Sequence, residues 1–101
     1  MTVLAHPARD EIRIADVLHA LADPVRLRIV RELATHAEGM SCGLLELGIT
    51  ASTLTHHVRT LREAGVIWVR PKGTSRISHL RRDDLDALYP GLLTGVLAAP
   101  R

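Results

Sequence analysis

The sequence predicts one mainly α-helical domain with a small β-hairpin, on three observations. Hydrophobic residues make up 47% of the 101 residues, but Trp68 and Tyr89 are the only Phe, Trp or Tyr among them. The core must therefore be built from aliphatic side chains, which favours helices packed on helices. Apolar residues recur at helical spacing through the first two thirds of the chain. Two β-branched runs, VIWVR and RISHL, then flank the turn sequence PKGTS.

We expect residues 1–9 to form a flexible arm and residues 10–101 the domain. A first helix should begin near Asp10. Its apolar stripe is Ile14, Leu18 and Leu21, at spacings of four and three residues. Asp23 should cap a second helix that starts at Pro24 and runs to about His36, since proline suits a first helical turn. In that helix we expect an inward apolar face and three arginines that mostly face elsewhere, Arg26, Arg28 and Arg31.

A short third helix is expected over residues 41–47, ended by Gly48 in the left-handed conformation. Thr50 should then cap a fourth helix that closes at Gly65. At about 100° per residue, one narrow stripe of this helix faces the core, namely Leu54, Val58 and Leu61. The opposite face is polar and carries Ser52, Thr55, His56 and Arg59, with Thr53 and Thr60 beside it.

The two adjacent histidines of this helix are expected to have different roles. Neighbouring helical residues point about 100° apart, so His56 and His57 do not easily bind one ion together. His57 lies about 60° from Leu54, beside the buried stripe. We therefore expect His57 to be half-buried, with its polar tip bonded inside the protein.

Beyond the hairpin, Asp83 or Asp84 should cap a fifth helix, which Pro90 and Gly91 break. The run LLTGVLAA should form a last helical segment.

Charge is concentrated in the second half of the chain. Residues 52–82 hold seven basic residues against the single acid Glu63, a net charge of +6 in a chain whose total is +2. Such asymmetry favours an anionic partner over an ordinary solvated surface. No apolar run approaches the ~20 residues of a membrane span, and the first residues do not resemble a signal peptide. With a single cysteine, these features predict a cytoplasmic protein.

The expected order of elements is the outline of a winged helix-turn-helix. Two of its sequence motifs, ALADPVRLRIVREL (residues 20–33) and STLTHHVRTLREAGVI (residues 52–67), precede a KGTSR wing. Together they resemble the ArsR family of bacterial repressors, over about residues 14–88. The resemblance implies a homodimer paired through its first and last helices, a fourth helix in the DNA major groove, and release of operator DNA by an inducer. The dimer contacts would be Ile14, Leu18, Leu92, Leu93, Val96 and Leu97.

Double-stranded DNA is therefore the expected partner, bound as a pseudo-palindromic operator. A recognition helix needs short polar groups near its N-terminus, followed by cations that reach the backbone. We expect the DNA-binding residues to be Ser52, Thr53, Thr55, His56, Arg59, Thr60, Arg62, Lys72 and Arg76.

The metal sites of the family's metal sensors do not fit this chain. Ser41 and Gly43 stand where one such site has two cysteines, and no histidine follows His79. We expect no metal site and no cofactor, because soft metals need several converging thiolate or imidazole ligands. Cys42 remains a candidate redox switch, since a helix N-terminus lowers the pKa of a thiol. Alternatively, Cys42 serves only as a small buried hydrophobic residue.

Two other classes of protein remain as alternatives, an enzyme and a protein-binding module. An enzyme would use His56 or His57 as a base with Ser52 or Thr55 as nucleophile, but no elbow, phosphate loop or orienting acid accompanies them. A winged helix that binds only protein would not need the +6 excess. Salt dependence separates DNA binding from an apolar protein interface.

Overall fold

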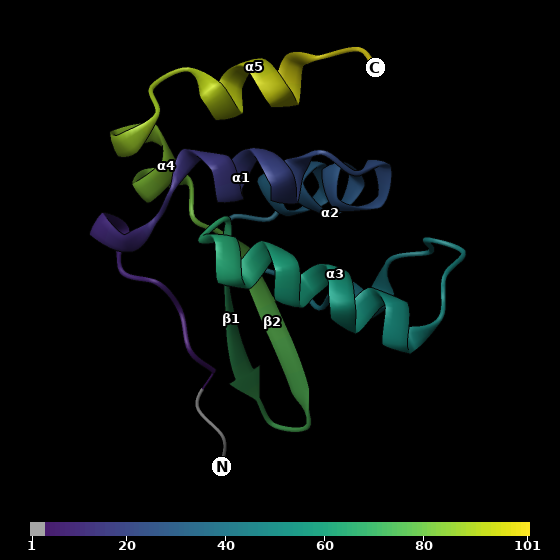
Figure 1. Ribbon diagram of the computed structural model, residues 1–101. Helices are drawn as coiled ribbons and strands as arrows, with labels where there is room; N and C mark the ends of the chain where they lie inside the picture. The colour runs from purple at the N-terminus through teal and green to yellow at the C-terminus, as the bar shows by residue number, and fades with distance from the viewer. Residues whose placement is uncertain (1–3) are drawn as a thin grey trace.

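The computed structural model describes residues 4–101, which form a three-layered domain (Figure 1). One end carries α5 and the other the tip of the hairpin, with α1 and α2 between them. The elements in chain order are η1 (Arg9–Glu11), α1 (Ile14–Leu21), α2 (Pro24–Ala34), η2 (Cys42–Leu44), α3 (Ala51–Ala64), β1 (Ile67–Lys72), β2 (Ser75–Leu80), α4 (Arg82–Leu88) and α5 (Leu92–Ala98), where η marks a 3-10 helix.

The chain enters the fold by a 3-10 turn rather than by the helix expected from Asp10. Glu11 accepts a hydrogen bond from the Ala8 backbone N–H (2.8 Å), which closes η1 over three residues. Ile12 then adopts an extended backbone and buries its side chain, leaving it 7% exposed. This interruption delays α1 to Ile14.

The start of α2 is confirmed. The Asp23 carboxylate accepts hydrogen bonds from the N–H groups of Val25 (2.8 Å) and Arg26 (3.1 Å), ahead of Pro24 in the first turn. These bonds hold the pKa of Asp23 below its usual value. The expected outward direction of the arginines is wrong for Arg26, which is buried, and correct for the exposed Arg28 and Arg31.

The third helix is much shorter than the expected residues 41–47. Met40 pairs with Ser78 of β2 through two backbone hydrogen bonds (2.8 and 3.0 Å), so the chain is still extended as it reaches Ser41. Only the 3-10 helix η2 follows, because Gly43 has low helix propensity and Leu45 returns to an extended backbone. Gly48 is left-handed as expected (φ +68°), but it lies within the loop between η2 and α3 rather than at the end of a helix.

The boundaries of α3 are confirmed at both ends. Thr50 Oγ1 accepts the Thr53 N–H (3.2 Å), and Gly65 ends the helix in the left-handed conformation (φ +88°). A Cβ on Gly65 would also lie 2.5 Å from the Ile12 side chain, so both backbone angle and space require glycine. Of the inward stripe, only Leu61 is fully buried, while Leu54 and Val58 are half-buried.

The two strands of the hairpin pair antiparallel, from Ile67 opposite Leu80 to Lys72 opposite Ser75. The two-residue turn between them has Gly73 at φ +60°, the pattern of a type II′ turn. Both outer edges of the hairpin base are covered, since Met40 pairs along β2 and His6 accepts the Val69 N–H of β1 (2.9 Å). Covered edges do not recruit further strands.

The last two helices close the core. The expected aspartate cap of α4 is wrong, because Arg81 holds the N-cap position without a side-chain bond and Asp83 and Asp84 lie in the first turn. Pro90 and Gly91 separate α4 from α5 as expected. Leu93 of α5 is fully buried within its own subunit, so it has no exposed surface to give to a dimer contact, and that assignment is wrong.

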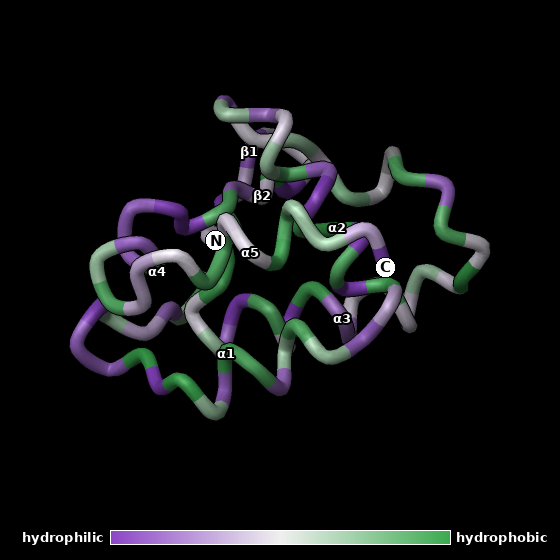
Figure 2. The backbone as a smooth tube through the Cα atoms, turned by 90° about the horizontal axis from the view of Figure 1, so that it is seen from above, coloured by the Kyte–Doolittle hydropathy of each residue, from purple (hydrophilic) through white to green (hydrophobic). Residues whose placement is uncertain are grey.

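The core lies where α1, α2, α3, β1 and α4 meet, around Val17, Ile29, Leu33, Leu61, Ile67 and Leu85. Figure 2 shows hydrophobic and hydrophilic residues alternating along α1. Two large apolar side chains of that helix point outward, Ile14 (43% exposed) and Leu18 (50% exposed). Within residues 4–101, no helix has both the length and the hydrophobicity that crossing a bilayer requires.

Candidate nucleic-acid interface

The N-cap and first turn of α3 present hydroxyl groups to solvent, and these groups are hydrogen-bonded to one another. The Thr50 hydroxyl donates to Thr53 Oγ1 (2.9 Å), and it also lies 3.2 Å from Ser52 Oγ. Thr53 Oγ1 therefore accepts within the cap and keeps its own proton free to donate outward. Ser52 and Thr53 are both exposed.

The threonines further along α3 use their hydroxyl protons inside the helix. Thr55 donates to the carbonyl oxygen of Ala51 (2.9 Å) and Thr60 to that of His56 (3.1 Å). Thr55 is exposed, whereas Thr60 is half-buried. Both hydroxyls remain acceptors, but neither has a proton free for a phosphate oxygen.

The predicted DNA-binding cations differ in their exposure and in their partners. Arg59 on α3 and Lys72 and Arg76 on the hairpin are exposed. Within residues 4–101, the ion pairs to acids involve only Arg9, Arg81 and Arg82. No acidic side chain there therefore neutralises Arg59, Lys72 or Arg76. Their field is thus available to an anionic partner.

Arg62 is held by the N-terminal segment instead. Its side chain is half-buried, and its Nη1 donates to the carbonyl oxygen of Ala5. Arg62 therefore contributes to the docking of residues 4–8, and its side chain is less exposed than those of Arg59, Lys72 and Arg76.

The two histidines of α3 are separated as the helical projection predicts. His56 is exposed, and His57 is half-buried with its Nδ1 3.0 Å from Arg26 Nη1. Because a guanidinium only donates, Nδ1 of His57 accepts and carries no proton. The internal bond expected for His57 is confirmed.

Arg26 is the residue that sequence reasoning missed. Besides His57, its guanidinium donates to the carbonyl oxygens of Ala20 (2.6 Å) and His19 (3.2 Å) at the end of α1. One buried cation thus links α1, α2 and α3. Its position in the first turn of α2, one residue from the buried stripe, gave no signal that it would turn inward.

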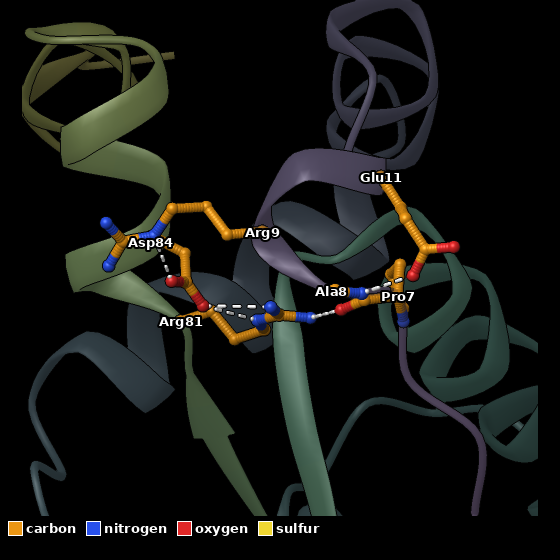
Figure 3. A network of polar contacts seen from close by, with 6 residues as sticks. All are labelled: Pro7, Ala8, Arg9, Glu11, Arg81 and Asp84. Carbon is orange, nitrogen blue, oxygen red and sulfur yellow. Dashed lines mark hydrogen bonds and ion pairs between the residues drawn. The ribbon is translucent and has the colours of Figure 1, made fainter.

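From Leu4 onward the N-terminal segment, which the sequence predicts to be a flexible arm, lies against the domain and makes hydrogen bonds with it; residues 1–3 lie outside the described residues. Figure 3 shows Arg81 at the centre of these contacts, donating to the Pro7 carbonyl oxygen (2.7 Å) and paired with Asp84 (2.9 Å). Arg9 reaches the other oxygen of Asp84 (2.7 Å). The charge of Arg81 also lies 3.7 Å from the centre of the Trp68 ring, a cation–π distance.

His6 completes this docking. Its Nε2 accepts the Val69 N–H, and its ring lies 5.0 Å from that of Trp68. Burial lowers the pKa of His6, and the nearby charges of Arg62 and Arg81 lower it further. Both effects favour the neutral ring that this hydrogen bond needs.

Cys42 does not have the environment expected of a redox switch. It is 5% exposed, and burial raises the pKa of its thiol, against a weaker opposing effect of a hydrogen bond with Ser78. The expected lowering by a helix N-terminus is wrong, since η2 is a single short turn. Within residues 4–101, no three His, Cys, Asp or Glu side chains come together in an arrangement for a metal ion.

Taken together, a capped helix with an exposed polar face beside a basic hairpin defines a DNA-binding winged helix-turn-helix protein. Comparison with known proteins agrees. Residues 21–70 match a family described as a helix-turn-helix domain. An uncharacterised HTH-type transcriptional regulator, YceK of Bacillus subtilis, is 36% identical over 83% of this chain and 85% of its own length.

Two further similarities narrow the class. The arsenical resistance operon repressor of Staphylococcus xylosus is 30% identical over 78% of this chain and 76% of its own length. The crystal structure of the transcriptional repressor BigR from Xylella fastidiosa matches with a TM-score of 0.59 and 28% identity, over 75% of this chain and 85% of that one. The chain belongs to the ArsR family of winged helix-turn-helix repressors. It is a DNA-binding transcriptional repressor.

Proposed function

We propose that the chain acts as a homodimer that binds a pseudo-palindromic operator through α3 and the hairpin and represses transcription by excluding polymerase. The observation that carries this proposal is the exposed polar face of α3 with basic residues of the hairpin beside it, since Arg59 and Arg76 line one cavity. No acidic residue lies between Gly48 and Arg62, and the outward face of this stretch leads to the exposed hairpin cations Lys72 and Arg76.

In the proposed complex, the side chains of this surface make different contacts with DNA. Ser52 and Thr53 donate hydroxyl protons to base edges or phosphate oxygens. Thr55, whose proton is used internally, contributes its methyl group to a thymine and its oxygen as an acceptor. His56 reaches further into the groove, and Arg59, Lys72 and Arg76 contact the phosphate backbone.

The dimer in this proposal forms through α1 and α5. Ile14 and Leu18 expose apolar surface on α1, and a cavity of about 290 Å³ between α1, α2 and α5 is lined by Leu18, Leu21 and Val96 among others. The half-buried Leu92, Val96 and Leu97 of α5 supply the remaining apolar surface. A two-fold axis here would place the recognition helices roughly 34 Å apart, one turn of duplex.

We do not extend the arsenical signal of the named relatives to this chain. Arsenical and soft-metal sensing needs several thiolates, and this chain has one cysteine, which is buried. The proposal places the repressor in the cytoplasm, without a catalytic role of its own, and leaves its control to a ligand that favours a DNA-incompetent shape.

Fluorescence anisotropy with a labelled duplex from the promoter of the chain's own gene tests the proposal. Arg59→Gln and His56→Ala should each weaken binding about tenfold, because the first removes a phosphate contact and the second a groove contact. Arg82→Gln is the matched control, an exposed cation on α4 that pairs with Asp86 at 3.5 Å. Unchanged affinity in both interface variants would mean that another face binds DNA.

A further inference from the structure

We infer that a cavity between α3, the hairpin and the N-terminal segment binds a small organic anion, and that this ligand controls the release of DNA. The cavity, here called the arginine cavity, has a volume of about 320 Å³. Pockets of this size and larger hold small-molecule ligands. Its role as a control site rests on the proposed DNA-binding function, whereas anion binding itself does not.

The charge of the arginine cavity selects an anion. Arg59, Arg62 and Arg76 all lie in its lining, and no acidic side chain does. A second cavity, of about 390 Å³ beside α4, also holds arginines but includes Asp83 and Asp84, which pair with or offset them. Three guanidinium groups without a carboxylate favour a ligand that carries negative charge, since guanidinium binds carboxylate and sulfonate through paired hydrogen bonds.

Besides the hydroxyl groups of Ser41, Thr55 and Ser78, the remainder of the lining has an apolar part, which favours a ligand with an apolar body. Leu54, Val58 and Val69 line the cavity together with Leu4 of the docked segment. Leu54 and Val58 belong to the inward stripe of α3 but are only half-buried, so part of their apolar surface faces this space. A carboxylate or sulfonate with a short alkyl chain or a single ring satisfies both parts of the lining.

The same geometry links the ligand to DNA. Arg59 and Arg76 are shared between the arginine cavity and the proposed interface, and they come from α3 and from the hairpin. An anion held by both neutralises charge that DNA needs. By linkage, DNA must weaken anion binding by the same factor as the anion weakens DNA binding.

The test uses octanoate as the probe and isothermal titration calorimetry of the full chain without DNA. Octanoate should bind saturably with a dissociation constant below about 1 mM. Inorganic phosphate, which has charge but no apolar body, should bind at least about tenfold more weakly. Absence of saturable octanoate binding, or equal affinity for phosphate, would overturn the inference.

Two variants locate the site, and one serves as a control. Arg62→Gln removes a cation of the lining, and Val58→Phe fills the space while keeping every arginine, so each should weaken octanoate binding at least about tenfold. Arg70→Gln, an exposed hairpin cation outside the lining, should change nothing. Thermal melting identifies any variant that fails to fold. If one of the two fails, octanoate binding by the other tests the location of the site. Octanoate binding that survives in the folded variants would place it elsewhere and contradict the assignment.

Anisotropy with the promoter duplex separates this inference from the proposed function. Octanoate at saturation should raise the apparent dissociation constant of the duplex at least about fivefold. Duplex binding that octanoate leaves unchanged would refute the control role alone. Octanoate binding by a chain that binds no duplex would instead refute the proposed function and leave the ligand site standing.

Discussion

The Arg26 guanidinium lies 3.0 Å from Nδ1 of His57 and joins α2 to α3. Because the same guanidinium holds two carbonyl oxygens at the end of α1, one buried cation links α1, α2 and α3. A shift of α1, the helix with the exposed apolar residues, would reach α3 through this group.

Replacing Arg26 by leucine should therefore destabilise the fold strongly. The change leaves the carbonyl oxygens of His19 and Ala20 and the His57 ring without their donor, a loss of about 3 kcal/mol in the free energy of unfolding. Arg28→Leu, an exposed neighbour on α2, should change stability by less than about 0.5 kcal/mol. Urea denaturation measures both, and equal effects would show that the Arg26 bonds contribute nothing.

The leucines of α3 should differ in their contribution to stability. Leu61 is fully buried, so Leu61→Ala should cost about 2–5 kcal/mol through lost burial and a cavity. Leu54 faces the arginine cavity and is half-buried, so Leu54→Ala should cost only about 1–2 kcal/mol. Equal losses in thermal or urea unfolding would mean that α3 is rotated from the orientation described here.

Docking of the N-terminal segment should weaken in mild acid. The pKa of His6 is lower in the folded chain than its ordinary value of 6.5, so the unfolded chain binds more protons between the two values. The stabilisation is present above pH 6.5 and is lost as the pH falls toward and through the folded pKa. His6→Gln, which does not titrate, should lose less free energy of unfolding between pH 7.5 and 5.5 than the unmodified chain.

If the profiles of the unmodified chain and of His6→Gln were parallel, the coupling of His6 to the docked segment would be refuted.

A charge on the outer face of α1 should separate the dimer. Leu18→Glu places a carboxylate on a residue that is 50% exposed in the single subunit and buried in the proposed dimer. Sedimentation should then report a monomer, without loss of the subunit's own fold. Asp16→Lys, a charge change on the other side of α1, should remain dimeric. A Leu18→Glu protein that sediments as the unmodified chain does would exclude α1 from the interface.

Local rules were enough to predict the elements with strong signals. The caps at Asp23 and Thr50, the left-handed Gly65 and the hairpin turn are confirmed because each depends on a few neighbouring residues. The failures depend on contacts between distant parts of the chain. The third helix shrinks to η2 because Met40 pairs with Ser78, thirty-eight residues later by number.

The site was predictable to the same extent. Exposure of Ser52, Thr53, Thr55, His56 and Arg59 follows from helical periodicity. Arg62 was predicted as a DNA-binding cation, but its bond to Ala5 needs the N-terminal segment to fold back, which no local pattern indicates. The inward turn of Arg26 likewise needs the free carbonyl oxygens at the end of α1.

The salt dependence of duplex binding tests the central claim most directly. If Arg59, Lys72 and Arg76 of each subunit contact phosphates, a dimer makes about six such contacts, and the logarithm of the affinity should fall with the logarithm of salt concentration at a slope of about −5. Arg59→Gln should make this slope shallower by about 2, one unit per subunit. A slope near zero, unchanged in the variant, would contradict DNA binding by this face and favour an apolar protein partner.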